Sequence, residues 1–174
     1  MRALVSCLLL FVCSISGVQA EQLAVDFLKG ESSVYGLRLG YRPVEYTLYQ
    51  LPVLGDIRLY MEASLNLWRY GEEAQYSSNA ALAFSPVLVK DFTTIYGKPL
   101  GWELGIGVSL LDRRRFAGRD MGSVYQFEDR LGLRLTLSPQ HSVSLRYMHY
   151  SNGGLNRPNP GIDFIALSYA LKFH

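Results

Sequence analysis

A histidine and a serine two residues apart, His149 and Ser151, are the side chains of this sequence whose types and spacing point to catalysis. In an extended strand, residues i and i+2 point to the same face and are neighbours there. An imidazole beside a hydroxyl can take the hydroxyl proton and so generate a nucleophile. The pair therefore predicts nucleophilic catalysis by Ser151, with His149 as its base.

A carboxylate would complete this pair by fixing the tautomer of the imidazole, and two aspartates are candidates. Asp163 lies at the start of the last apolar segment and can sit beside His149 once the preceding connection is counted back. Asp129 faces His149 directly if Leu137 pairs with His141 across a tight turn. The spacing alone leaves both acids open.

The elements that must position these residues are strands. Large apolar residues alternate with small, polar or charged ones, so that Leu145, Tyr147 and His149 share one face. This period of two predicts eight strands. Their approximate ranges are 22–29, 33–42, 56–69, 78–92, 98–112, 121–137, 141–151 and 162–173.

Two features favour a transmembrane barrel over a water-soluble β-sandwich. The segments run for about ten residues or more, the length of a tilted membrane-spanning strand. Charged residues of both signs lie at strand centres, where they can pair inside a narrow lumen. These residues are Arg38, Arg58, Glu62, Glu103, Glu128, Arg130, Arg134 and Arg146. The sequence predicts an all-β fold, an eight-stranded antiparallel transmembrane β-barrel of the outer membrane.

Composition and the N-terminal segment bound the remaining possibilities. Among 174 residues the formal net charge is +2, which gives no case for a nucleic-acid partner. No stretch after the first twenty residues approaches the apolar length of a transmembrane helix. Residues 1–20 have the tripartite pattern of a signal peptide cleaved after Ala20, leaving 21–174 as one barrel domain. Both cysteines, Cys7 and Cys13, would leave with the signal, so a metal site built on thiolates is excluded.

An even number of strands places both termini on the periplasmic side, where short turns belong. The tightest connection is expected at Ser138–Gln140, on that side. The connections 113–121 and 152–161 are expected outside. The segment 43–55 is long for a periplasmic turn and fits this topology poorly.

The stretch His149-Tyr150-Ser151-Asn152-Gly153-Gly154-Leu155, with Pro158–Asp163 after it, resembles the PagL family of outer-membrane lipid A 3-O-deacylases. Weaker supporting stretches are 82–87, 103–108 and 127–132, and the likeness runs from about residue 33 to the end. The resemblance implies a barrel whose active site faces the lipid of the outer leaflet. It assigns His149, Ser151 and Asp163 to the catalytic triad. The usual acid of the family is Glu, so Asp163 is shorter by one methylene.

The resemblance also implies what the enzyme binds. Its oxyanion groups would fall within Asn152, Gly154 and Asn159, and its substrate would be the lipid A of lipopolysaccharide. No metal or cofactor is implied, and family members can form homodimers.

Three functions remain to be separated. The first is an esterase that removes the 3-O-linked acyl chain of lipid A. The second is a phospholipase or acyltransferase barrel that uses the same groups on another lipid. The third is a noncatalytic barrel that adheres or tethers and has no use for the three residues.

Overall fold

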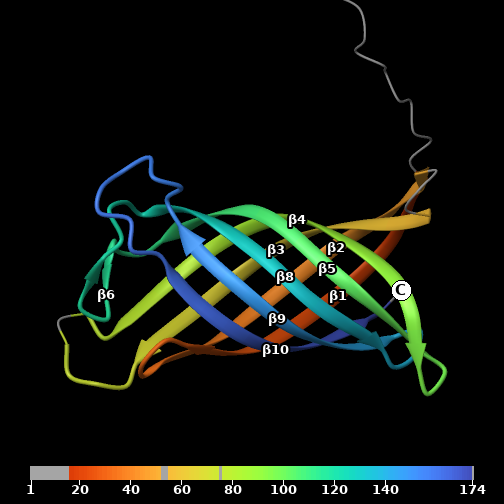
Figure 1. Cartoon of the computed structure of the whole chain (residues 1–174), viewed down its shortest axis with the longest axis horizontal. Coiled ribbons are helices and arrows are strands. Elements are labelled where there is room, and N and C mark those ends of the chain that lie inside the picture. Colours follow the sequence, from red (N-terminus) through yellow and green to blue (C-terminus); the bar gives the residue numbers. More distant parts are fainter. Residues whose placement is uncertain (1–15, 52–54, 75, 174) are drawn as a thin grey trace, which may run out of the picture.

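The computed structural model describes residues 16–51, 55–74 and 76–173, in which eight strands form a closed antiparallel barrel (Figure 1). The strands are β1 (Ser16–Gly30), β2 (Val34–Leu51), β3 (Gly55–Tyr70), β4 (Ser78–Ile95), β5 (Lys98–Leu111), β8 (Tyr125–Thr136), β9 (His141–Ser151) and β10 (Ile162–Lys172). Two further strands, β6 (Arg115–Phe116) and β7 (Arg119–Asp120), pair only with each other. β1 closes the barrel against β10. The predicted fold class is confirmed.

The two ends of the barrel differ in their connections. Residues 71–74 and 76–77 and the longer connections 112–124 and 152–161 lie at one end with 31–33, and we call this the loop end. The connections 96–97 and 137–140 and the C-terminal end of β10 lie at the other, the turn end. The long connections predicted at 113–121 and 152–161 therefore share one end, opposite the 137–140 turn.

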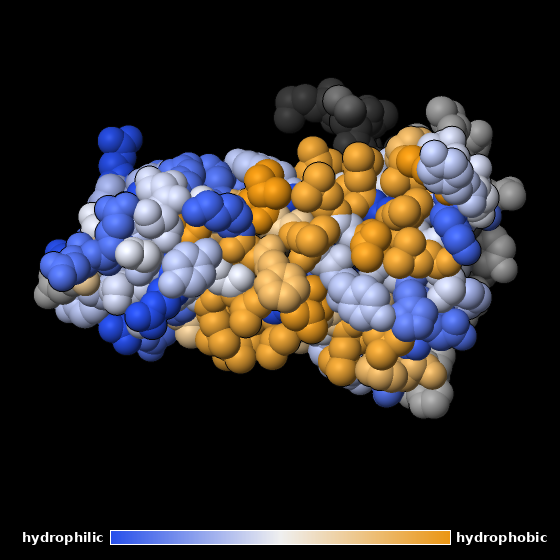
Figure 2. All heavy atoms as spheres, turned by 90° about the horizontal axis from the view of Figure 1, so that it is seen from below, coloured by the Kyte–Doolittle hydropathy of each residue, from blue (hydrophilic) through white to orange (hydrophobic). Residues whose placement is uncertain are grey.

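The outer surface of the barrel carries the large apolar side chains. On β5, for example, Leu104, Ile106 and Val108 are exposed, whereas the residues between them are buried. On the face that Figure 2 shows, apolar residues form a broad band across the middle of the barrel, between more polar ends. Such a band suits contact with hydrocarbon, and barrel closure leaves no strand edge unpaired. Within the described ranges, no helix is long and apolar enough to cross a membrane.

The lumen is filled by paired charges. Glu62 accepts hydrogen bonds from Arg38 (2.5 Å), Arg42 (2.7 Å) and Arg130 (2.7 Å), and none of these side chains is exposed by more than 1%. Arg146 joins Glu103 (2.6 Å) and Asp26 (3.0 Å) in the same way. The pairing predicted for the strand-centre charges is thus present, except at Arg58, which lies partly exposed beside Asp91. Arg134 is a second exception, because within the described residues it forms no ion pair and its Nε and Nη1 are buried without a hydrogen-bond partner.

Aromatic packing closes the lumen at the loop end. The ring of Trp68 lies 4.8 Å from that of Tyr150 and 5.2 Å from that of Phe164, measured between centroids. The β6–β7 hairpin adds Phe116 to this cluster, 6.1 Å from Trp68, and Met121 follows it into the interior. The hairpin was not foreseen, and it explains why the strand predicted from residue 121 begins only at Tyr125.

Two predictions about the turn end are wrong. Residues 43–51 form the last part of β2 rather than a long turn, because a register shift between Tyr41 and Val44 lets the strand continue past Pro43. The tightest connection is Tyr96–Gly97, not Ser138–Gln140. Both residues have positive φ, 48° and 70°, as a two-residue hairpin with a type I′ turn requires.

The start of β1 bears on the predicted signal peptide. This strand begins at Ser16 and so includes the last five residues of the segment 1–20. Residues 1–15 lie outside the described part of the chain. Cleavage after Ala20 stays a prediction.

Candidate active site

His149 lies near the loop end of β9, between two acidic neighbours. Its cross-strand partner on β10 is Asp163, and its partner on β8 is Asp129. Both registers considered from the sequence are therefore present. Only Asp163 contacts the ring: its Oδ1 lies 2.6 Å from His149 Nδ1, and each side chain is 32% exposed. Because a carboxylate can only accept, Nδ1 carries the hydrogen and Nε2 is left to act as a base.

Ser151 ends β9 on the same row as His149 and lies opposite Phe127 of β8. It is only 9% exposed. In the described structure no hydrogen bond joins its hydroxyl to His149. Such bonds are often long in free enzymes and shorten when substrate binds. The structure thus brings the three residues into one region, and His149 and Asp163 are joined by a hydrogen bond.

Tyr147 adds a contact that sequence analysis missed. Its hydroxyl donates to Asp163 Oδ1 at 2.7 Å, the same oxygen that faces His149 Nδ1. Tyr147 precedes His149 by two residues, so its place on the row was visible in the sequence. Its role as a donor was not, because that depends on where Asp163 lies.

The backbone of Gly161 packs closely against the imidazole of His149. Its φ is +66°, and a Cβ built on it would lie 2.7 Å from His149 Cε1 and 3.4 Å from Nε2. The Gly161 carbonyl accepts a hydrogen bond from Arg119 (3.5 Å), whose guanidinium also binds Glu31 (2.6 Å). Through Arg119 and Glu31, the β6–β7 hairpin and the connection between β1 and β2 thus help to fix the position of Gly161. Sequence analysis did not single out Gly161.

Two of the three expected oxyanion groups are already engaged. Asn152 is fully buried, and its side-chain NH₂ donates to the carbonyls of Met121 (3.0 Å) and Pro158 (3.4 Å). The Gly154 N–H donates to Asn152 Oδ1 at 3.0 Å. The backbone N–H of Asn152 donates to Asn159 Oδ1 at 2.9 Å, which fixes the orientation of that amide. Of these three candidates, Asn159 is the one whose NH₂ group donates no hydrogen bond within the described structure.

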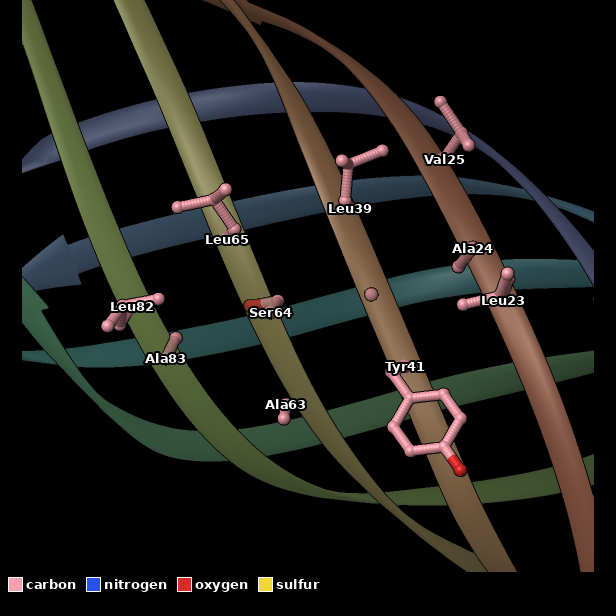
Figure 3. Close-up of a pocket in the computed structure, with 11 residues that line it drawn as sticks. Leu23, Ala24, Val25, Leu39, Tyr41, Ala63, Ser64, Leu65, Leu82 and Ala83 are labelled. Carbon is pink, nitrogen blue, oxygen red and sulfur yellow. The ribbon is translucent and has the colours of Figure 1, made fainter.

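A surface hollow of about 570 Å³ lies away from these residues. It is lined by β1 to β4, with Leu23, Leu39 and Leu82 among its walls (Figure 3). In the strand order β3 lies across the barrel from β9, so this hollow occupies the opposite wall. Its lining contains no acid, histidine or cysteine. The described residues also include no group of three or more His, Cys, Asp or Glu side chains arranged to hold a metal ion.

A closed eight-stranded barrel with an apolar band on its outside defines an outer-membrane β-barrel. Comparison with known families narrows this class. The family model "Lipid A 3-O-deacylase (PagL)" matches residues 35–172, most of the chain and all of the candidate site residues. The chain belongs to the PagL family, and family and fold together imply the outer membrane as its location.

Individual relatives agree with this placement. The lipid A deacylase PagL of Pseudomonas aeruginosa is 37% identical over 117 residues, which cover 67% of this chain and 66% of the relative. The Bordetella bronchiseptica protein of the same name is 42% identical over 71 residues, 41% of this chain and 40% of that protein. A crystal structure of the outer membrane enzyme PagL superposes with a TM-score of 0.71 and 28% identity. It covers 86% of this chain and 98% of its own.

Proposed function

We propose that this chain is an esterase that hydrolyses the 3-O-linked acyl chain of lipid A in the outer leaflet. The observation that carries the proposal is the 2.6 Å contact between His149 and Asp163, two residues from Ser151, on the apolar outside of a PagL-family barrel. Ionisable groups on a lipid-facing surface are costly and mark functional sites. A noncatalytic barrel gains nothing from this arrangement.

The proposed reaction proceeds in two steps. Ser151 Oγ attacks the ester carbonyl while His149 Nε2 takes its proton, and Asp163 stabilises the resulting imidazolium. The tetrahedral intermediate collapses when His149 gives the proton to the sugar oxygen. The sugar then leaves as a free hydroxyl, and the acyl chain stays bound to Ser151 as an ester. A water molecule, deprotonated by His149, then releases the fatty acid and restores the serine.

Asn159 is the oxyanion donor that the hydrogen bonds support best. Donors must be fixed in advance and aimed at the developing negative charge. The amide of Asn159 is held by its oxygen and leaves its NH₂ group to donate, whereas those of Asn152 and Gly154 are committed elsewhere. Of the three groups considered, Asn159 therefore fits the role.

The orientation in the membrane follows from the connections. Barrels of this kind have long extracellular loops and short periplasmic turns. His149, Ser151 and Asp163 lie toward the loop end, so we place the site at the outer leaflet, where lipid A is the substrate. Assembly into homodimers stays a prediction from the family.

The mass of lipid A, measured before and after incubation with detergent-folded protein, tests the proposal. We expect the loss of one hydroxyacyl chain with the wild type and with Ser144→Ala, a luminal serine on the same strand. Ser151→Ala should leave the mass unchanged. Cleavage of phospholipid with intact lipid A would favour a phospholipase instead, and an inert wild type would favour a noncatalytic barrel.

A further inference from the structure

Arg134 of β8 is the exception among the buried arginines of the described barrel. Arg38, Arg42, Arg130 and Arg146 each lie within 3.2 Å of a carboxylate oxygen. Arg134 is 6% exposed, yet its Nε and Nη1 have no hydrogen-bond partner in the part of the chain that the structure describes. A buried charge without a partner is strongly unfavourable.

The nearest acids are committed to other partners. Glu103 accepts hydrogen bonds from Arg146 (2.6 Å) and Tyr60 (3.4 Å). Glu45 accepts from Gln22 (3.0 Å) and lies 3.6 Å from Arg58. Neither lies within ion-pair distance of Arg134, so within the described chain its guanidinium forms no ion pair and has these two carboxylates only as more distant neighbours.

A small polar hollow lies at this place, at the turn end of the barrel. Its volume is about 150 Å³, and Arg134, Thr136 and Lys172 are among its lining residues. Thr136 Oγ1 is also buried without a hydrogen-bond partner in the described structure. Lys172 forms no ion pair with any described residue. Arg58 and Glu45 also line the hollow, but Arg58 is already paired with Asp91 (2.8 Å) and lies 3.6 Å from Glu45. Arg134 and Lys172 are therefore the cations of the lining that are left without an ion pair among the described residues.

We propose that this hollow binds a phosphate group. A guanidinium fork, a hydroxyl and an ammonium are the donors that a tetrahedral oxyanion accepts from. The volume equals that of about five water molecules at about 30 Å³ each, enough for a group of five heavy atoms. The phosphate is either free inorganic phosphate or the headgroup of a lipid in the adjacent leaflet, since both present the same chemistry.

Thermal unfolding of the detergent-folded barrel tests this site, because a ligand that binds only the folded state raises the unfolding midpoint. The first arm compares sodium phosphate with sodium chloride at equal ionic strength. The second compares micelles doped with phosphatidylglycerol and with diacylglycerol, which lacks the phosphate. We expect a rise of about 3–6 °C at ten times the dissociation constant. A rise in the unfolding midpoint with sodium phosphate would show that free phosphate is sufficient. A rise only with phosphatidylglycerol would show that the ligand is a lipid headgroup.

Variants separate this site from a general salt effect. Arg134→Met should abolish the rise and should not lower the midpoint in chloride, because it removes an unpaired buried charge. Arg134→Lys keeps the charge but loses the fork, so a smaller rise is expected. Lys98→Met, an exposed cation outside the hollow at the same end, should keep the full rise. An equal rise in Arg134→Met and wild type, or no rise in either arm, would overturn the proposal.

Discussion

The lumen and the outer face of β8, β9 and β10 both hold ionisable residues, but under different conditions. In the lumen, Glu62 and its three arginine partners are fully buried. On the outer face, His149 and Asp163 are about one-third exposed and hydrogen-bond to each other, and Asp163 also accepts a hydrogen bond from Tyr147. Ion pairs in the lumen thus connect side chains of several strands, whereas the hydrogen bonds of His149 and Asp163 connect residues of the site.

Because of this difference, we expect substitutions in the two regions to change different properties, stability in the lumen and turnover in the site. Removing one partner of a buried ion pair leaves the other charge buried and uncompensated. Removing His149 or Asp163, which are partly exposed on the outside, leaves no fully buried charge behind to destabilise the fold. Substitutions in the lumen should therefore lower the free energy of unfolding, and substitutions in the site should lower turnover.

The largest effects on turnover are expected for Ser151→Ala and His149→Ala. Each removes a group that bonds to or exchanges protons with the substrate, so deacylation should fall by about 10⁴- to 10⁶-fold. Unfolding midpoints in urea should match the wild type. Near-normal turnover of Ser151→Ala would show that another residue is the nucleophile.

The next largest effect separates the two acids beside His149. Asp163→Asn should lower turnover by about four orders of magnitude, since it removes the acceptor that selects the tautomer. Asp129→Asn should have a milder effect, because Asp129 makes no hydrogen bond or ion pair with the ring in the described structure. Asp163→Glu should keep or raise activity. The reverse ranking of the two Asn variants, measured as kcat, would move the acid to β8.

In the lumen, Glu62→Gln should destabilise the barrel by about 3–5 kcal/mol, because three arginines lose a shared anion. Turnover per folded molecule should be unchanged. Urea unfolding in lipid vesicles measures the loss of stability, and the deacylation assay measures turnover. Glu73→Gln, an exposed carboxylate at the loop end, serves as the control and should be neutral. An equal loss of stability in both variants would mean that the lumen pairing is not what stabilises the fold.

A smaller effect is expected at Gly161. Gly161→Ala would place a methyl group against His149 and displace the base, and displacements of about 1 Å can cost about 100-fold in rate. We expect kcat to fall about 10- to 100-fold with little change in KM. Gly118→Ala is the matched control: its φ is +73°, and a Cβ there meets nothing within 4 Å. If both variants lose activity equally, backbone strain and not the ring contact is the cause.

The smallest effect is expected for Tyr147→Phe, which removes one hydrogen bond to Asp163. A net contribution of about 0.5–1.5 kcal/mol corresponds to about a two- to tenfold fall in kcat. Tyr169→Phe, another outward tyrosine on the neighbouring strand β10, should leave kcat unchanged. An unchanged kcat in Tyr147→Phe would show that Asp163 is held by His149 alone.

Most of the barrel was predictable because one physical rule recurs in every strand. Side chains such as Leu104 and Ile106 face outward while their neighbours face the lumen, and this alternation is visible in the sequence. The prediction failed where backbone geometry interrupts the alternation. A register shift after Tyr41 carries β2 past Pro43, and two residues with positive φ, Tyr96 and Gly97, suffice to connect β4 and β5.

The site was predictable only where it follows strand parity. His149, Ser151 and both acids could be placed by counting along β8, β9 and β10. The contribution of Gly161 and the engagement of Asn152 could not, because they depend on how the 152–161 connection folds back over the strand. That connection has no periodicity from which its path could be inferred.

Labelling of the folded barrel with a fluorophosphonate that carries an acyl chain tests the central claim most directly. Such a probe reacts with a serine only when a base activates it, and peptide mass spectrometry identifies the modified residue. We predict a single adduct on Ser151 in the wild type, much slower labelling in His149→Ala, and a wild-type rate in the lumen variant Glu62→Gln while it remains folded. An adduct on another serine, or equal labelling rates in wild type and His149→Ala, would contradict the assignment of the outer face as the catalytic site.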